Sequence, residues 1–400
     1  MFQKILKKAR ENESRVVQFL RDLIDIKSLS SQEEQVIYRI KEEMEKCDYD
    51  EITIDPMGNI LGRIGNGKHI IAMDAHVDTV DVGNPANWTI DPFKGAMKDG
   101  IIYGRGACDM KGALASIVYG GKIIKELGLE DDYSLYIVGS VQEEDCDGLC
   151  WQYIINEGKL RPEVVVIAEP TNLGIYRGHR GRIEIEVRTK GISCHGSVPE
   201  RGVNAIYKMA TIIQDIEKLN DRLTGEPFLG KGTVTISEIR STSPSLCAVA
   251  DSSTIHLDRR LAATDTMESA VREIQELPSV KRVKAEVAVL DYSVPSWHGL
   301  TYPTKKYYPT WLLPENHPVL VAGVKTFEGL FSQKPTINRW VFSTNGVAVM
   351  GMHGIPCIGF GPGNEIYAHM ATEQIPIEHL VKASAWYAAF PTIFTKDEHG

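Results

Sequence analysis

Six acidic and imidazole side chains stand at positions where apolar stretches end or glycines gather. They are His76, Asp78, Asp109, Glu143, Glu144 and Glu169. Ligands of an open α/β sheet bind at the carboxyl ends of its strands, so we expect these side chains to converge. Several carboxylates at one spot repel each other unless a divalent cation neutralises them. The pattern therefore predicts a metal site at the edge of a sheet.

The mixture of nitrogen and oxygen donors indicates which metal such a site would take. Imidazole with carboxylates suits zinc, and manganese or cobalt is possible. Five or more donors exceed one tetrahedral ion, so two ions sharing a bridging carboxylate fit the set better. Two ions polarise a carbonyl and lower the pKa of a bound water to roughly 7. A carboxylate that is not a ligand would then serve as general base.

The first part of the chain alternates between helical and strand patterns, which predicts an α/β fold with a largely parallel core. A capping box, Ser31 to Glu34, precedes one of the expected helices. The other helices are expected at 2–26 and 112–127, and the strands at 52–54, 60–64, 69–75, 135–138 and 164–168.

A different pattern begins near Arg182, where apolar and charged residues alternate as in a half-exposed strand. The following elements are expected at 203–219 (helix), 233–239 and 253–261 (strands), 265–277 (helix, with Asp265 and Glu268 as a capping box) and 283–291 (strand). The order βαββαβ is that of a ferredoxin-like unit. A helix at 318–331 and a strand at 356–360 then resume the first pattern. We therefore expect one domain in two parts, 1–181 and 296–400, with residues 182–295 inserted.

The composition limits the partners and the setting. The 400 residues exceed what one core usually serves, and the net charge of −9 disfavours nucleic acid or an anionic membrane. No apolar run approaches the roughly 20 residues of a membrane span, and the N-terminal stretch lacks the apolar core of a secretory signal. The 7 cysteines lack the spacing of a disulfide framework, which predicts free thiols and a cytoplasmic location.

Distinctive short motifs extend along nearly the whole chain. They are residues 76–80, 88–93, 103–106, 109–112, 143–144, 168–170, 193–196 with Pro199, 361–363 and 368–369. These motifs resemble those of the M20 metallopeptidase and deacylase family, which includes acetylornithine deacetylase, succinyl-diaminopimelate desuccinylase, aminoacylases and carboxypeptidase G2-like enzymes. Residues 142–151 most resemble its YgeY-like branch of selenium-metabolism-linked hydrolases.

The resemblance implies a zinc-hydrolase fold and a set of metal ligands. Asp109 would bridge two zinc ions, with His76 and Glu169 completing one site and Glu144 and His369 the other. His353 and His379 compete with His369 as the last ligand, but the Gly-Pro-Gly context favours His369. The family also implies a cis peptide bond between Asp109 and Met110.

The resemblance further implies roles in catalysis and substrate binding. Glu143 would be the general base, and Asp78 would hydrogen-bond His76. His195, on the inserted lid and dimerisation domain, would stabilise the oxyanion, in the family often from the partner subunit. Arg260 would bind a substrate carboxylate. Asn345 stands near the pocket where relatives often carry aspartate, and Cys247 where many carry asparagine.

Together these observations predict a di-zinc hydrolase that cleaves an amide or peptide C–N bond in a small, carboxylate-bearing substrate. An N-acyl amino acid deacylase and a dipeptidase both fit. An N-carbamoyl amino acid amidohydrolase is the alternative, and a non-catalytic metal-binding scaffold is the alternative of another class. We expect a homodimer formed through the inserted domain.

Overall fold

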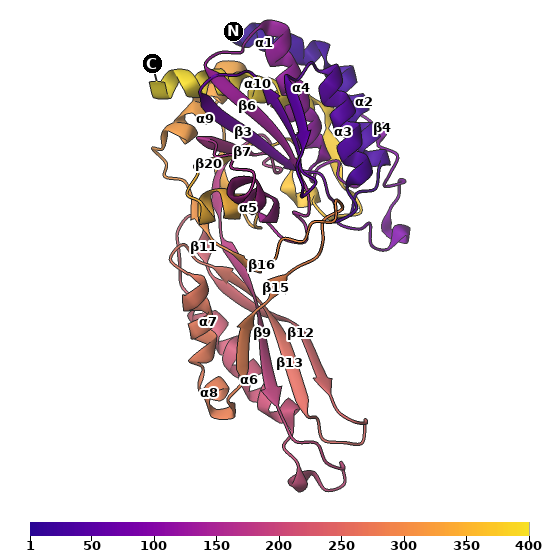
Figure 1. The fold of residues 1–400 in the computed structure, drawn as a ribbon, viewed down its shortest axis with the longest axis vertical. Helices are drawn as coiled ribbons and strands as arrows, with labels where there is room; N and C mark the ends of the chain where they lie inside the picture. Colours follow the sequence, from indigo (N-terminus) through magenta and orange to yellow (C-terminus); the bar gives the residue numbers. More distant parts are fainter. Residues whose placement is uncertain (400) are drawn as a thin grey trace.

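The computed structural model describes residues 1–399, with side chains as far as residue 396. The chain forms a rounded larger unit and an elongated inserted unit that extends away from it (Figure 1). Each unit has its own hydrophobic core: the first core draws on residues from Ile5 to Phe394, and the second lies between Ile183 and Val280. None of the helices in the described part of the chain is both long and apolar enough to cross a lipid bilayer.

A mixed β-sheet forms the centre of the larger unit. Its order is β1-β2-β6-β3-β7-β20-β8-β18, and β19 also pairs with β8. The central pairs β6–β3, β3–β7 and β7–β20 are parallel, so the predicted parallel core is confirmed there. The strands are β1 Glu51–Ile54, β2 Ile60–Ile64, β3 His69–His76, β6 Tyr133–Ser140, β7 Val164–Ile167, β8 Ile175–His179, β18 Trp311–Leu312, β19 Ile337–Trp340 and β20 Cys357–Gly359.

Helices cover the central sheet, and α10 packs against α1, α4 and α9. The predicted single helix at 2–26 is wrong in one respect, because Asn12 separates it into α1 and α2. The predicted capping box is not formed: Glu33 turns inward and accepts the backbone N–H of Gln142. The helices of this unit are α1 Phe2–Glu11, α2 Glu13–Asp25, α3 Glu34–Lys46, α4 Lys111–Leu127, α5 Leu149–Asn156, α9 Pro318–Phe331 and α10 Ile377–His399.

The inserted unit has the predicted βαββαβ order. Its antiparallel sheet has the order β12-β13-β9-β14, which is the ferredoxin-like arrangement. A short helix that the sequence pattern missed begins at Pro278, so the last strand starts at Glu286 rather than at 283. The capping box of α7 is formed by Thr266 and Ser269, not by Asp265 and Glu268. The elements are β9 Gly181–Lys190, α6 Ala205–Arg222, β12 Thr233–Thr242, β13 Ser252–Leu261, α7 Met267–Gln275, α8 Pro278–Val283 and β14 Glu286–Val289.

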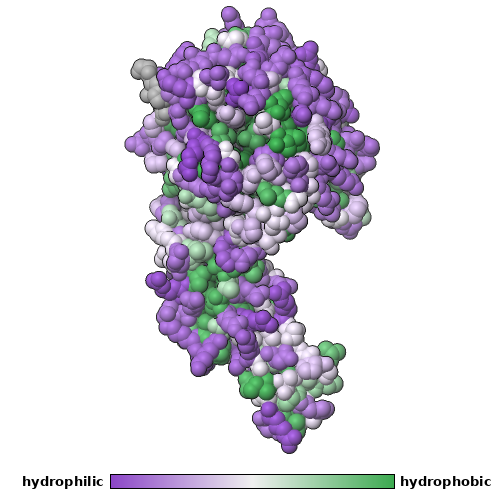
Figure 2. Space-filling model, in the orientation of Figure 1, coloured by the Kyte–Doolittle hydropathy of each residue, from purple (hydrophilic) through white to green (hydrophobic). Residues whose placement is uncertain are grey.

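Short strands form three small sheets, β21-β5-β4, β10-β11 and β15-β16, and β17 pairs with β9 in the inserted unit. In the visible face of the molecule, hydrophobic residues gather over the middle and the far end of the inserted unit (Figure 2). The short strands are β4 Ala96–Lys98, β5 Ile101–Tyr103, β10 Gly225–Glu226, β11 Gly230–Lys231, β15 Asp291–Tyr292, β16 Thr304–Lys305, β17 Tyr307–Tyr308 and β21 Gln374–Pro376.

Candidate metal centre and active site

Three neighbouring parallel strands bring the predicted metal ligands together. His76 is the last residue of β3, and it lies opposite Ser140 of β6 in the register. The Glu143–Glu144 pair follows β6, and Glu169 follows β7 on the other side of β3. Because the three strands run in the same direction, their carboxyl ends place these side chains at one edge. The predicted convergence is therefore present.

Asp109 lies between two imidazole rings. Its Oδ1 is 3.0 Å from Nε2 of His76, and its Oδ2 is 3.3 Å from Nε2 of His369. His76 Nε2 is also 3.5 Å from Oε1 of Glu169, whereas His369 Nε2 is 3.1 Å from Oε2 of Glu144. Each oxygen of Asp109 thus faces a different histidine and carboxylate pair, as expected of a bridging ligand. The Asp109–Met110 peptide bond is cis.

Buried carboxylate oxygens without partners fit a pair of bound cations. Glu143 Oε1, Glu144 Oε1 and Glu169 Oε2 are buried and accept no hydrogen bond from the described residues. Donor atoms of His76, Glu143 and Glu169 lie within 4.8 Å of one another, and so do those of His76, Asp109 and Glu144. Buried, unpaired carboxylates are strongly unfavourable, so this donor set suits divalent metal ions.

The side chains of the cluster shift one another's protonation. Burial, together with the charges of Asp147 and Glu169, raises the pKa of Glu143 well above its usual value. Burial lowers the pKa of His76, but the nearby carboxylates, Glu143 first, outweigh it and raise that pKa well above the usual range. Hydrogen bonds to Asp109 and Glu144 raise the pKa of His369 to about 10. The cluster without metal therefore favours protonated side chains, and metal ions would take the place of those protons.

Asp78 holds two parts of the cluster in place. The imidazole Nδ1 of His76 lies 2.9 Å from the backbone carbonyl of Asp78, whereas the Asp78 carboxylate is farther away, at 3.6 Å. That carboxylate instead accepts the backbone N–H groups of Glu143 at 3.2 Å and Glu144 at 3.0 Å, and the hydroxyl of Ser30 at 2.7 Å. The hydrogen bond predicted between Asp78 and His76 is thus accepted by the main-chain carbonyl of Asp78, whereas the Asp78 carboxylate orients Glu143 and Glu144.

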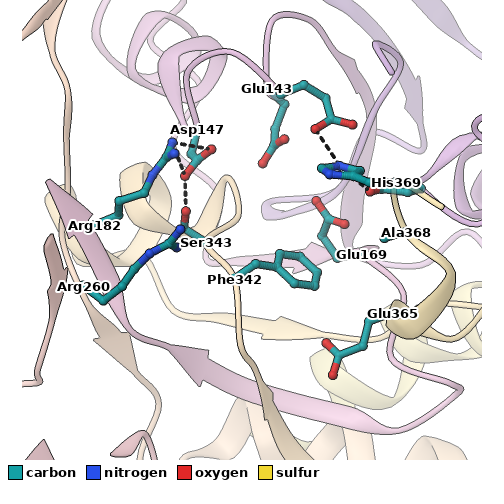
Figure 3. Close-up of a pocket in the computed structure, with 12 residues that line it drawn as sticks. Glu143, Asp147, Glu169, Arg182, Arg260, Phe342, Ser343, Glu365, Ala368 and His369 are labelled. Atoms are coloured by element: carbon teal, nitrogen blue, oxygen red, sulfur yellow. Dashed lines mark hydrogen bonds and ion pairs between the residues drawn. The ribbon is translucent and has the colours of Figure 1, made fainter. Parts of the chain in front are cut away.

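A cavity of about 310 Å³ opens beside the cluster. Figure 3 shows arginines from the inserted unit on one side and the proposed metal ligands on another, with Phe342 between them. Besides cluster residues, the cavity is lined by Asp147, Arg182, Arg260, Phe342, Ser343, Glu365 and Ala368. A cavity of this size suits a small molecule.

Arg260 lines the cavity as predicted, and Arg182 lies beside it. The two residues are partners in the register of β13 and β9, so their side chains leave the sheet on the same face. Arg182 Nη2 is 3.4 Å from Oδ2 of Asp147, which also accepts the Ser343 hydroxyl. Arg182 was not among the predicted site residues. The alternation along its strand was a signal in the sequence, but its pairing with Arg260 is visible only in the folded sheet.

Two predicted site residues, His195 and Asn345, belong neither to the cavity lining nor to the metal cluster. His195 is exposed in the loop after β9, where its Nδ1 accepts from the backbone N–H and the hydroxyl of Ser197. Asn345 is buried beneath the site; its amide donates to Asp74 at 2.9 Å and accepts the backbone N–H of Gly148 at 2.8 Å. The position of Asn345 does not support the predicted contact with substrate, because the side chain is 1% exposed and fully engaged with the core.

The rejected alternatives to His369 lie away from the donor atoms. His379 accepts the backbone N–H of Gly363 at 3.2 Å, and burial lowers its pKa to about 4. His353 lies at the end of a helical turn and is in neither group of possible metal ligands among the described residues. The histidine after Gly-Pro-Gly is therefore the one that joins the cluster.

A buried glutamate that the sequence analysis missed supports the loop carrying Asp109. One oxygen of Glu373 accepts the backbone N–H groups of Cys108 and Asp109, each at 3.0 Å. The other oxygen is 2.6 Å from Arg105. Glu373 stands four residues after His369 in a loop without regular pattern, so only the folded structure brings it to this place.

The chain is similar to known proteins in sequence and in fold. Residues 72–392 match the peptidase family M20/M25/M40. The chain is 54% identical over 390 residues to protein YgeY of Escherichia coli K12, covering 98% of this chain and 97% of that protein. It is 34% identical over 200 residues to a probable succinyl-diaminopimelate desuccinylase of Staphylococcus aureus Mu50, covering 49% of this chain and 50% of that protein. A solved Bacillus subtilis structure, the YXEP protein described as a dinuclear metal-binding peptidase, is similar with a TM-score of 0.72 at 15% identity, covering 97% and 99% of the two chains.

Proposed function

Because the chain belongs to the peptidase family M20/M25/M40 and is a metal-dependent hydrolase, we propose that it cleaves an amide or peptide C–N bond in a small carboxylate-bearing substrate. The observation that carries this proposal is the arrangement around Asp109. Its two oxygens face two different imidazoles, and each imidazole has a further carboxylate beside it. This is a donor set for two metal ions.

In this proposal the ions would be zinc, with Asp109 as the ligand that they share. His76 and Glu169 would hold one ion, and Glu144 and His369 would hold the other. When bound, the two ions supply Lewis acidity, which polarises the scissile carbonyl and lowers the pKa of water to roughly 7. The description of the similar Bacillus subtilis protein as dinuclear supports two ions rather than one.

Glu143 is the proposed general base. It lies in the same buried cluster, 3.9 Å from His76, and its Oε1 has no hydrogen-bond partner among the described residues. That free oxygen accepts a proton from the attacking water and passes it to the leaving nitrogen. Without metal, burial and neighbouring carboxylates raise the pKa of Glu143, and two bound cations would oppose that rise and favour the ionised form that a base needs.

The arginine side of the cavity is the proposed binding place for a substrate carboxylate. Arg260 supplies the guanidinium, and Arg182 beside it adds positive charge. An N-acyl amino acid or a dipeptide satisfies this arrangement. An N-carbamoyl amino acid is the alternative, because a ureido group presents the same type of carbonyl next to the same carboxylate.

We also propose that two chains pair through the inserted unit. Strand β12 is a long edge strand whose outer half is exposed, and it carries Ile239 at 55% exposure. An exposed edge of this kind is stabilised when a second copy extends the sheet. Light scattering of the purified protein tests this pairing, and a monomer would contradict it.

The test of function combines metal analysis with a substrate screen. The protein is loaded with zinc, manganese or cobalt and assayed against N-acetyl, N-succinyl and N-carbamoyl amino acids and dipeptides. We expect about two metal ions per chain and turnover of at least one class. A metal-loaded protein inert across the panel would instead favour the non-catalytic scaffold.

The Glu143→Ala substitution separates catalysis from metal binding. Removal of a general base typically costs about 10²–10⁴-fold in rate, so kcat should fall by that range while the metal content stays the same. The matched control is Glu42→Gln, which removes an exposed carboxylate on α3. Wild-type kcat in the Glu143→Ala protein would refute the assignment of the base.

A further inference from the structure

Glu365 is the one acidic residue lining the cavity that has neither a metal-cluster role nor a partner in the described chain. The other lining carboxylates belong to the cluster, except Asp147, which binds Arg182 and Ser343. Glu365 makes no hydrogen bond and no ion pair with the described residues, and its Oε2 is fully buried. Its chemistry is therefore not explained by the catalytic arrangement.

The surroundings of Glu365 make its isolation unfavourable for a charged carboxylate. Burial raises its pKa, and the charge of Arg339 opposes this rise. The Nε of Arg339 donates to the carbonyl of Leu229 at 3.2 Å, so this arginine is anchored to another segment. A cation brought to this carboxylate would offset the unfavourable free energy of its partial burial.

The cavity places this carboxylate opposite positive charge. In Figure 3 Arg182 and Arg260 lie on one side of Phe342, and Glu365 lies on the other side, below the cluster. A ligand that spans the cavity thus meets guanidinium groups at one end and a carboxylate at the other. The site is complementary to a molecule with two opposite charges.

We propose that Glu365 binds a cationic amino group of the substrate, so that the preferred substrates carry an ammonium group as well as a carboxylate. This inference rests on the proposed function and narrows its substrate class. The ammonium group has two possible sources: the free N-terminus of a dipeptide, or the side-chain amine of an N-acylated diamino acid. In both, the ammonium donates hydrogen bonds to the oxygens that now have none.

The experiment compares ligands that differ only in the amine. One pair is L-alanyl-L-alanine and N-propionyl-L-alanine; the other is N2-acetyl-L-ornithine and N-acetyl-L-norvaline. Calorimetry measures their binding to metal-loaded Glu143→Ala protein, with and without the additional substitution Glu365→Gln. The Glu143→Ala substitution prevents turnover of the ligands during the measurement. Because calorimetry reports binding alone, its result does not depend on the reaction that we propose.

We expect Glu365 to favour the amine-bearing member of at least one pair by about 10- to 100-fold in Kd, the range of a charge-assisted hydrogen bond. Glu365→Gln should abolish that preference, and Glu365→Asp, which keeps the charge, should retain its direction. The pair that shows the preference identifies the source of the amine. In proteins with an intact Glu143, Glu365→Gln should likewise lower the ratio of kcat/KM for the amine-bearing substrate to kcat/KM for its amine-free counterpart.

Two controls exclude indirect effects. Metal content must be equal in all variants, because Glu365 precedes His369 by four residues. Glu42→Gln should leave the preference unchanged. The inference would be overturned if the protein with Glu365 showed no preference for the amine-bearing ligand of either pair, or if Glu365→Gln left that preference unchanged. The proposed function would instead be overturned if the wild-type protein turned over none of the panel substrates.

Discussion

Asp78 connects the end of β3 to the two glutamates that follow β6. Its carbonyl accepts from His76, and its carboxylate accepts from the backbone of Glu143 and of Glu144. The carboxylate is fully buried, so its orientation is fixed by these donors. One residue therefore sets both the direction of an imidazole and the place of the proposed base, through different atoms.

The substitution Asp78→Asn separates these two tasks. The main-chain carbonyl of residue 78 remains, so His76 keeps its orientation. The side-chain amide, however, has one oxygen and one nitrogen, so it can accept only one of the two backbone N–H groups of Glu143 and Glu144. We expect kcat to fall about 10- to 100-fold, a typical loss for a residue supporting metal ligands. Steady-state kinetics and metal titration measure the two effects. A larger loss of metal affinity than of kcat would contradict the proposed division.

At the scale of elements, His179 joins the end of β8 to two neighbouring segments. Its Nδ1 lies 2.9 Å from the carbonyl of Arg180, so Nδ1 is the protonated ring nitrogen and donates a hydrogen bond to that carbonyl. Its Nε2 accepts from the indole of Trp311 at 2.7 Å and from the backbone N–H of Thr344 at 3.1 Å. A proton on Nε2 would break both contacts, and burial accordingly lowers the pKa of His179 to about 4.

This arrangement predicts a stability that depends on pH. An unfolded chain protonates His179 near pH 6.5, but the folded chain does so only near 4, so stability is lost as the pH falls between these values. The loss reaches about 3 kcal/mol. Denaturant unfolding of metal-free wild-type and His179→Gln proteins measures it. The advantage of the wild type should shrink on acidification, and a constant difference would refute the prediction.

Regular elements and site residues differed in how far the sequence predicted them. The strands and helices with strong periodicity, such as α9 at Pro318–Phe331, followed from local pattern alone. Candidate metal-binding residues such as His76, Glu144 and Glu169 could be predicted because each ends or closely follows a buried strand, whereas the choice of His369 depended on the family resemblance. Glu373 and Glu365 were not predictable from local pattern, since Glu373 lies in a loop and Glu365 begins a single 3-10 turn, Glu365–Tyr367, and only the folded chain brings both to the site.

Burial also reversed one prediction in a way that sequence spacing does not reveal. Asn345 stands close to cavity residues Phe342 and Ser343 in the chain. The chain then turns into the helical segment Val347–Met352, which directs Asn345 inward to Asp74. Adjacent positions in a turn thus face opposite environments, and their hydrogen-bond partners come from other strands.

At the scale of the whole molecule, the length of the inserted unit separates His195 from the metal cluster. Arg182 lies at the cavity, at the start of β9, and His195 follows the other end of that strand. A strand of 10 residues spans about 33 Å at about 3.3 Å per residue. His195 of one chain therefore does not reach its own cluster, and a catalytic role requires a second chain to present it.

A mixing experiment tests that arrangement. His195→Ala and Glu143→Ala proteins are each expected to be nearly inactive, because every site in either dimer lacks one group. In a mixed dimer, the site built on the His195→Ala chain has its own Glu143 and receives His195 from the partner. Random exchange of subunits should thus restore about a quarter of wild-type activity, since half of the dimers are mixed and each has one complete site. Activity is measured after the subunits have exchanged under mild denaturant. If the mixture stays inactive although mass spectrometry shows mixed dimers, His195 does not act across the interface.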